Sequence, residues 1–398
     1  MSCTPGALAR RLVIADGHGR GWFIALFLSV IPSLWMIQVR PGLAAPFRVM
    51  GMHGPVTIPS YLPGDCVLYR AAAASLLADG DLDLRNNVDW TVVRAEGNVA
   101  VSQNGAWVPK HPLLLPILAL PLFAVAGDPG LLAFNLMELA LLDGLVLWLA
   151  MRFVRPGVAF ATALLFALTT LLRPLAYNFS PDVLSSVLVV GGIAALLERR
   201  FAWSGLLLGL SVAAKWTNVA FLVPTAVAVV ASGRWRGLAR FATGVAPALL
   251  ALACLNWHWF GSPLVTPYDR VLPAAGDPAI RDAFDVPFWR GLWAQLTDPR
   301  LGLVVSAPPV LIAVPGFAFL WRRSRSEALL LLSCVVLQIV IFAPYRYWSA
   351  SVAGHRFLLT AIVLCAPAAA LELERFADAP HRRRHPAACT GAPGSSAA

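Results

Sequence analysis

The chain is poor in charged residues. Only 13% of its 398 residues are Asp, Glu, Lys or Arg, whereas 58% are hydrophobic, and a soluble domain carries about 25% charged residues. This composition excludes an ordinary soluble domain and predicts a polytopic, all-α membrane protein. The net charge of +10 is then interpreted as the excess of basic residues on cytoplasmic loops. No basic patch with interleaved aromatic residues predicts a nucleic-acid partner.

Cysteine is scarce too, with six residues and no Cys-x-x-Cys pair, so neither a disulfide framework nor a zinc site is predicted. The stretch 79–83, Asp-Gly-Asp-Leu-Asp, resembles the start of a calcium loop. It lacks the Gly at the sixth position and the Glu at the twelfth, so we expect a polar turn there. We expect no cofactor, and the residues give a divalent metal no support.

Long apolar runs are numerous, and they predict the membrane spans. A first run follows Arg20, and no small-residue cleavage site comes after it, so an uncleaved span is predicted there. Two long polar stretches, 40–111 and 260–301, interrupt the runs. The candidate spans are 21–39, 130–151, 157–176, 182–198, 203–215, 217–232, 238–259, 302–321, 328–344 and 355–372.

The arginine clusters that flank these runs predict the topology. If all of them are cytoplasmic, the segment 112–127 does not cross, and its three prolines favour a re-entrant or surface-lying helix. Ten crossings follow, with 40–111 and 260–301 outside; eleven is the alternative. We predict one transmembrane domain over 1–376 and a disordered cytoplasmic tail over 377–398.

Lysine is almost absent. The only two, Lys110 and Lys215, both fall on the predicted outer face, where basic residues are disfavoured. That face also carries His111, the turn around Asp182 and the turn that ends at Arg356. Each cation could simply anchor a helix end at the lipid headgroups. Together they could bind a phosphate, because Lys and Arg form charge-assisted hydrogen bonds with it.

The stretch that begins at Asp65 has a helical pattern. Leu68, Ala72 and Leu76 make one apolar stripe, as in a helix lying on a membrane surface. Asp65 and Tyr69 share a face of this helix. Asp65 is either an N-terminal cap or a functional carboxylate.

Three further acids also admit two interpretations. Asp182 follows Ser180 and Pro181. It is either part of an ordinary helix start or a second functional acid on the predicted outer face. Glu138 and Asp143 lie inside a predicted span, where carboxylates are rare and usually functional. They serve either a proton relay or packing within the bundle.

The order of these motifs resembles the GT-C superfamily of membrane glycosyltransferases, which includes the protein mannosyltransferases and the aminoarabinose transferases of lipid A. The matching blocks are Pro-Gly-Asp-x-x-x-Tyr, Asp-Gly-Asp-Leu-Asp-Leu-Arg-Asn-Asn, Lys-His-Pro, Ser-Pro-Asp-Val-Leu and Gly-His-Arg-Phe-Leu. The resemblance covers most of 20–372. Its most specific parts are the blocks at Asp65 and at 110–112.

The resemblance implies an inverting transferase that moves a sugar from a polyprenyl-phosphate donor to a hydroxyl of a lipid, glycan or protein acceptor. It implies an integral protein of the bacterial inner membrane with its site facing the periplasm. Asp65 would be the catalytic base, and Tyr69 and Asp182 would position the acceptor or the loop. The donor phosphate would be bound by Lys110, His111, Lys215 and Arg356.

One block departs from the family. Many relatives have Gly-Asp-Glu-Pro-His-Tyr where this chain has Gly-Asp-Cys-Val-Leu-Tyr over 64–69, so a Glu and a His are missing. The loss weakens a metal site, since two adjacent carboxylates would be its natural ligands. It leaves the alternative of a catalytically inactive scaffold. A transporter or flippase of lipid-linked sugars is a second alternative, which Glu138 and Asp143 inside the predicted span favour. Transporters usually carry internal repeats, and the chain shows none.

Overall fold

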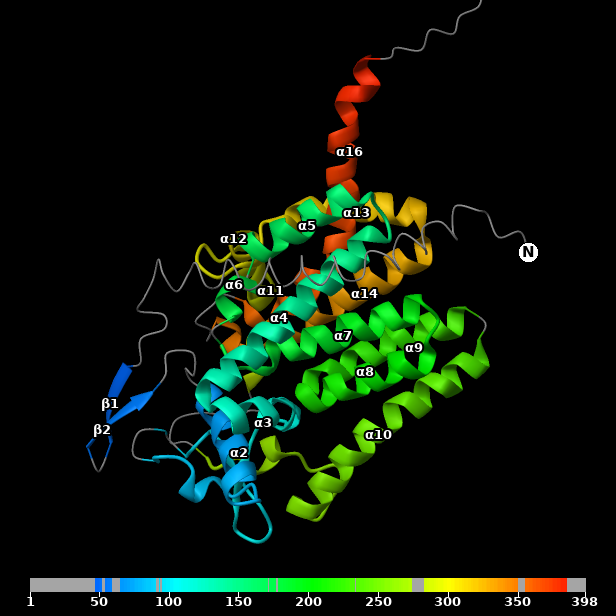
Figure 1. Cartoon of the computed structure of the whole chain (residues 1–398). Coiled ribbons are helices and arrows are strands. Elements are labelled where there is room, and N and C mark those ends of the chain that lie inside the picture. The colour runs from blue at the N-terminus through cyan, green and yellow to red at the C-terminus, as the bar shows by residue number, and fades with distance from the viewer. Residues whose placement is uncertain are drawn as a thin grey trace, which may run out of the picture.

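The computed structural model describes residues 47–51, 54–58, 65–90, 93, 95–170, 172–176, 178–232, 234–273, 283–349 and 355–384. The described chain is mainly helical, as predicted, with its helices packed around an apolar core (Figure 1). The predicted first span, 21–39, lies outside the described residues.

The bundle follows the predicted apolar runs closely, although prolines and polar residues divide several of them. The run 157–176 splits after Thr169, and the run 302–321 splits before Pro309. The helices are α4 (Asp128–Met151), α5 (Pro156–Thr169), α6 (Leu172–Leu175), α7 (Pro181–Leu197), α8 (Phe201–Ala214), α9 (Leu222–Ala231), α10 (Trp235–Phe260), α11 (Phe288–Thr297), α12 (Leu303–Ser306), α13 (Pro309–Arg323), α14 (Arg325–Phe342), α15 (Leu359–Leu364) and α16 (Ala366–Arg384).

Three of the described helices, α4, α10 and α14, are long and apolar enough to cross a membrane. A fourth span arises if the segments 356–364 and 366–378, which meet at an angle of 49°, are taken as one. The other predicted spans are shorter apolar helices, below the roughly 20 residues of a full crossing. The count of ten spans, or eleven, stays a prediction.

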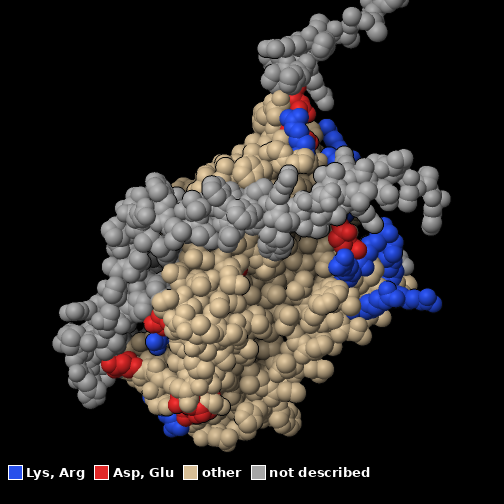
Figure 2. Space-filling view, viewed as in Figure 1, with Lys and Arg blue, Asp and Glu red and all other residues tan. Residues whose placement is uncertain are grey.

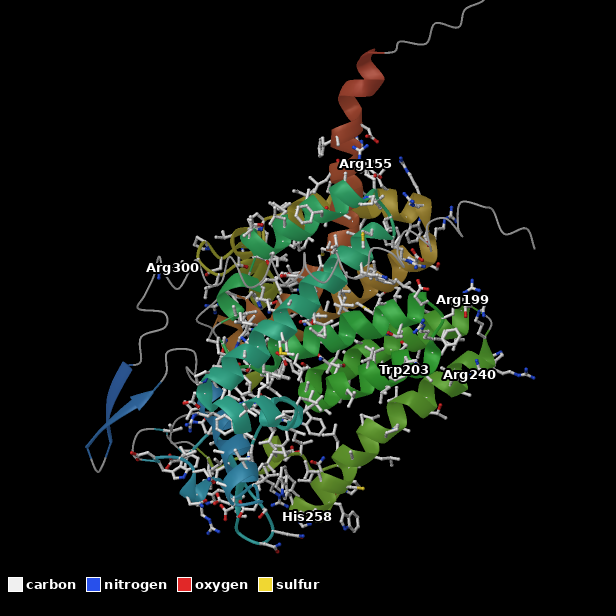
Figure 3. The ribbon with its side chains drawn as sticks, in the orientation of Figure 1. Arg155, Arg199, Trp203, Arg240, His258 and Arg300 are labelled. Carbon is white, nitrogen blue, oxygen red and sulfur yellow. The ribbon has the colours of Figure 1, made fainter. Side chains whose placement is uncertain are left out.

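Helices α8 and α10 touch along glycines. A Cβ at Gly205 would lie 2.0 Å from the Phe241 carbonyl oxygen, and one at Gly244 would lie 2.1 Å from the Ala202 carbonyl oxygen. Only Gly lets the two backbones approach this closely, as small residues do between membrane helices. This contact holds α10 along the bundle, where it runs from Arg240, at the right of Figure 3, to His258 at the bottom.

The first polar loop is not purely helical, which corrects the all-α prediction. Strand β1 (Phe47–Gly51) pairs antiparallel with β2 (Gly54–Ile58), and β3 (Val99–Val101) pairs with β4 (Trp107–Pro109). Short hairpins satisfy the backbone of a polar segment outside the bundle. A short 3₁₀ helix, η2 (Leu84–Asn86), precedes the second hairpin.

Helix α2 (Cys66–Ala78) is the predicted surface helix, but most of its residues are buried. The stripe residues Leu68 and Ala72 are only 2% and 1% exposed. Alanine side chains let α2 lie against its neighbour α3 (Leu114–Ala126), so its stripe packs on protein and not on lipid. Helix α3 is the predicted non-crossing segment; its 13 residues are too few for a full crossing.

The polar turn after α2 is formed as predicted. Ser75 donates a hydrogen bond from Oγ to Asp81 Oδ1 at 2.8 Å, and Asn87 donates to Asp79 at 2.7 Å. At the other end of the chain, α16 continues to Arg384, past the start of the predicted tail at 377. The residues 385–398 are outside the described part.

Candidate active site

Asp65 precedes the first turn of α2, but its side chain does not cap the helix. The carboxylate faces three basic side chains: Lys110 Nζ and His111 Nε2 each lie 3.5 Å from Oδ1, and Arg356 lies 3.6 Å from Oδ2. The cap interpretation is therefore wrong for the side chain. Because 30% of the Asp65 side chain stays exposed, another molecule can reach it.

His111 is fixed from two sides. Its ring stacks on Tyr69, with centroids 5.3 Å apart and planes at 19°. Its Nδ1 lies 2.9 Å from the Tyr268 hydroxyl. If Tyr268 donates to Nδ1, the ring proton is on Nε2 and faces Asp65, which is the tautomer we assign from this network.

Asp182 forms the second acidic centre. Lys215 donates to its Oδ1 at 2.7 Å, and Ser180 Oγ donates to its Oδ2 at 3.0 Å. Lys215 also lies over the rings of Phe342 and Phe357, at 5.5 and 4.9 Å from their centroids. Such cation–π contacts stabilise an ammonium that has lost water. The Ser180 side chain thus orients Asp182 and does not cap α7.

Arg356 joins the two acidic centres. It lies 3.6 Å from Asp65 and 3.8 Å from Asp182, distances too long for hydrogen bonds. Its Nε is buried and has no hydrogen-bond partner among the described residues. A buried donor without a partner is costly, so Arg356 is the cation best placed to accept an anionic ligand.

Lys110, in contrast, is already engaged. Its Nζ donates to the Gly97 carbonyl oxygen at 2.8 Å and to Asn98 Oδ1 at 3.1 Å. Gly97 and Asn98 directly precede the β3–β4 hairpin. Lys110 therefore ties the hairpin to Asp65 and holds a positive charge beside the carboxylate.

These contacts set the charge states. Burial by itself would raise the pKa of Asp65, but His111, Lys110 and Arg356 together hold the pKa of this carboxyl below its usual range. Burial lowers the pKa of His111, although Asp65 opposes the shift. At neutral pH the site therefore contains an ionised Asp65 and a neutral His111.

Replacing Lys110 by Met is expected to shift the acid limb of kcat/KM for the reaction proposed below. The profile reports groups of the free enzyme. Lys110 lowers the pKa of Asp65, so its loss raises that pKa and moves the acid limb to higher pH. Lys110→Arg keeps the charge and should leave the limb in place. A limb at the same pH in all three proteins would contradict the assignment of this limb to Asp65.

The residues at the positions of the missing Glu and His are buried. Cys66 and Leu68, which occupy their positions, are 0% and 2% exposed. Cys66 Sγ donates to Asn178 Oδ1 at 2.7 Å, and burial raises its thiol pKa. Both side chains belong to the packing of α2. The described residues contain no group of three or more His, Cys, Asp or Glu side chains that could hold a metal.

The acids inside the bundle are separate from this cluster. Asn135 donates from Nδ2 to the carbonyl oxygens of Leu175 and Ala176, at 2.8 and 2.7 Å. Asn135 thus satisfies the backbone at the end of α6. Glu138 is 5% exposed, and its carboxyl oxygens have no hydrogen-bond partner among the described residues. Asp143 is also buried.

The structure thus brings all seven predicted site residues into one cluster, from five separated parts of the chain. Sequence reasoning missed Tyr268, which belongs to the 3₁₀ helix η4 (Pro267–Arg270). It also missed the aromatic support of Lys215. No sequence spacing distinguishes a functional tyrosine in a long polar loop, although the loop 260–301 was predicted to lie on the same face as Asp65.

Comparison with known proteins supports the fold. No protein-family model matches the chain, and no curated protein matches it in sequence. Two solved structures share its fold. One is ArnT from Cupriavidus metallidurans bound to undecaprenyl phosphate, with a TM-score of 0.54 and 13% identity over 93% of this chain and 61% of that one. The other is the oligosaccharyltransferase of Archaeoglobus fulgidus in the apo form, with a TM-score of 0.53 and 13% identity over 90% and 51%.

The chain therefore has the fold of these two membrane proteins, as the predicted resemblance implied. The chain spans about 61% and 51% of the lengths of these two proteins.

Proposed function

We propose that the chain is an inverting glycosyltransferase that moves a sugar from a polyprenyl-phosphate donor to an acceptor hydroxyl. The observation that carries the proposal is the position of Arg356, which lies between two carboxylates and has a buried Nε without a partner. The structural similarity to ArnT bound to undecaprenyl phosphate supports a polyprenyl-phosphate partner.

The reaction needs one base and one anion site. The acceptor hydroxyl gives its proton to the Asp65 carboxylate while its oxygen attacks the anomeric carbon. The bond between that carbon and the phosphate oxygen breaks on the opposite face, and polyprenyl phosphate leaves with the electron pair. A positioned base contributes about 10²–10⁴-fold, and fixed cations stabilise the charge that collects on the phosphate.

Donor binding also tunes the base. In the free protein the cations around Asp65 hold its pKa low, which makes it a weak base. A phosphate bound by Arg356 brings negative charge close to Asp65 and draws the guanidinium away from it. Both changes raise the pKa of Asp65, so the base becomes stronger when the donor is in place.

The other residues of the cluster take supporting roles. Lys110 and Lys215 are each engaged by protein oxygens, so we assign them to positioning Asp65 and Asp182 more than to the phosphate. Tyr69 and His111 form one wall beside Asp65, where an acceptor would lie. The donor site faces the periplasm of the bacterial inner membrane in this proposal.

Replacing Arg356 by Gln is expected to raise KM for the lipid-linked donor and to lower kcat. The guanidinium binds the phosphate in the ground state and stabilises its added charge in the transition state, so both quantities change. Arg356→Lys keeps the charge but loses the fork that suits phosphate and should be intermediate. Donor titrations with all three proteins test the assignment; an unchanged KM and kcat in Arg356→Gln would contradict it.

A translocator of lipid-linked sugars is the second candidate, and Glu138 is the observation that favours it. Buried membrane carboxylates often belong to proton pathways, and Glu138 has no partner among the described residues. A headgroup-translocation assay in vesicles without an acceptor distinguishes the two. Translocation that Glu138→Gln abolishes, with no sugar transfer, would replace the transferase assignment.

A further inference from the structure

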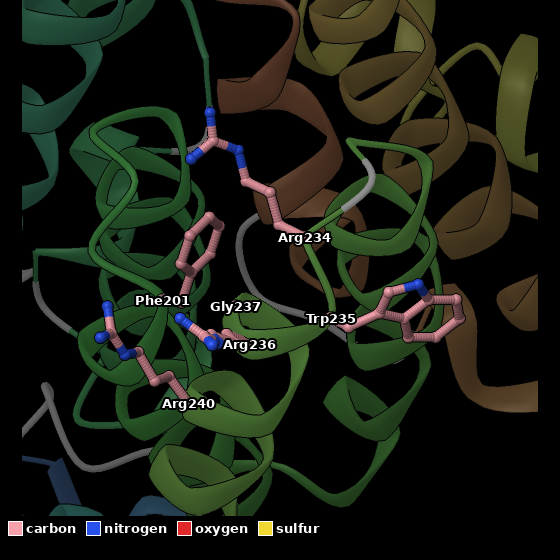
Figure 4. Close-up of a pocket in the computed structure, with 6 residues that line it drawn as sticks. All are labelled: Phe201, Arg234, Trp235, Arg236, Gly237 and Arg240. Atoms are coloured by element: carbon pink, nitrogen blue, oxygen red, sulfur yellow. The ribbon is translucent and has the colours of Figure 1, made fainter.

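A basic cavity lies far from Asp65. It has a volume of about 380 Å³ and is lined by Phe201, Arg234, Trp235, Arg236, Gly237 and Arg240 (Figure 4). These residues come from the start of α8 and the start of α10. The 26-residue α10 is about 39 Å long, and its other end, at Trp259 and Phe260, packs beside α2. The cavity and the Asp65 cluster are therefore at opposite ends of this helix.

The three arginines of the cavity lack counter-charges. None of them forms an ion pair within the part of the chain that the structure describes, and the first turn of α10 carries no acid. Carboxylates are available nearby, because helices α7 and α14 place Glu198 and Glu327 at the same end of the bundle. Both of these acids are engaged by Arg152, at 2.9 and 3.0 Å.

This arrangement is electrostatically unfavourable without an anion. Like charges repel, and the start of a helix carries the positive end of its dipole, which disfavours cations. An anion in the cavity would relieve both effects. The positive-inside rule explains why arginines are at this end but does not explain why three of them surround one cavity.

The walls of the cavity are suited to a lipid. Trp235 is 69% exposed, and Trp203 on the neighbouring α8 is 59% exposed; exposed Trp is typical of the membrane interface. Figure 3 shows Trp203 and Arg240 at the same end of the bundle, and Figure 2 shows basic side chains gathered there.

An apolar stripe leads to the cavity. Val223, Val227 and Val230 follow one face of α9 and are 62%, 60% and 36% exposed. Helix α9 ends at Ala231, just before Arg234, and lies beside α10. An acyl chain lying on the valines would place its headgroup at the arginines.

The packing of the cavity depends on Gly237. A Cβ at this position would lie 2.9 Å from the Phe201 ring, so Gly lets α10 come close to that ring. Phe201 is 9% exposed and forms an apolar floor, while the guanidinium groups reach into solvent. In Figure 4 Trp235 points away from the three arginines.

We infer that this cavity binds the headgroup phosphate of an anionic phospholipid, with Arg234, Arg236 and Arg240 as its ligands. The site is separate from the donor site and does not depend on the proposed transfer reaction. It would anchor this end of the bundle at the leaflet opposite the Asp65 cluster.

Native mass spectrometry of the full chain, released from phosphatidylglycerol micelles, tests the site. Arg236→Gln with Arg240→Gln is the test variant, and Arg322→Gln with Arg323→Gln is its control. Both pairs remove two exposed arginines from the same end of the bundle, and Arg322 and Arg323 end α13 outside the cavity. Losing one direct hydrogen bond to a charged phosphate weakens binding about tenfold, so the test pair should bind phosphatidylglycerol about 100-fold more weakly.

Each outcome either supports or overturns the lipid site. Wild type and control should retain phosphatidylglycerol, and phosphatidylcholine, whose own cation neutralises the phosphate, should be retained poorly. Equal retention by the test and control pairs would overturn the site. Displacement of the lipid by millimolar inorganic phosphate would show a free-anion site instead. If the double variant does not fold, Arg240→Gln alone should weaken binding about tenfold.

Discussion

Asp65→Asn is expected to reduce sugar transfer by about 10²–10⁴-fold, the usual contribution of a positioned general base. The amide has nearly the shape of the carboxylate but cannot accept the proton of the acceptor hydroxyl. The variant should fold, because the carboxylate is partly exposed and its three basic neighbours lie at 3.5–3.6 Å without short hydrogen bonds. Transfer of labelled sugar in membranes that contain the purified chain measures the effect.

Asp79→Asn is the matched control. Asp79 belongs to the same polar loop and is exposed, and its carboxylate accepts hydrogen bonds from the Asn86 and Asn87 side chains of the turn after α2. Its loss should leave transfer unchanged. An Asp65→Asn protein with full activity would contradict the assignment of the base.

Breaking the ion pair between Asp182 and Lys215 is expected to cost about 3–5 kcal/mol of stability, the range for a buried pair that loses one partner. The Asp182 side chain is only 4% exposed and that of Lys215 is 15% exposed. Lys215→Met leaves a buried carboxylate, which Arg356 compensates only in part from 3.8 Å. Equilibrium unfolding in mixed micelles measures the loss.

The double variant makes this prediction specific. With Asp182→Asn added to Lys215→Met, neither unpaired charge remains, so the double variant should be more stable than the sum of the two single losses predicts. The exposed pair Arg346–Asp285 is the comparison, because water solvates both of its partners and its removal should change stability little. Additive losses at Asp182 and Lys215 would show that the two side chains do not stabilise each other.

Much of the fold follows from the sequence. The apolar runs predicted most of the helices, because burying apolar side chains in protein or lipid is the main stabilising effect in such a chain. Their interruptions were harder to predict, since Pro and Gly inside a run either kink a helix or divide it. The two hairpins of the first loop were missed, because their short strands alternate weakly and lie among polar residues.

The predicted topology alone was enough to group most residues of the candidate site. The predicted topology puts the two lysines on one face with Asp65, Asp182 and Arg356, and the structure also brings these residues together. Topology could not show which cation pairs with which acid. That depends on distances of a few ångströms, such as the hydrogen bonds that engage Lys110 and leave Arg356 between the two carboxylates.

The surroundings of α2 also differ between the prediction and the structure. A stripe of apolar residues predicts a face that avoids water, but it does not distinguish lipid from protein as the partner. Three consecutive alanines, 71–73, are almost fully buried because small side chains allow close packing. The apolar stripe was predicted correctly, but it packs on protein and not, as had been predicted, on the membrane surface.

The most direct test is the pool of polyprenyl-phosphate-linked sugars in cells that produce either the wild-type chain or Asp65→Asn, with the native gene removed. Mass spectrometry of extracted lipids and surface glycans measures donor and product together. The proposed function predicts that one lipid-linked sugar accumulates with Asp65→Asn while one glycoconjugate loses the same sugar. Identical lipid-linked sugars and glycans in the two strains would contradict it.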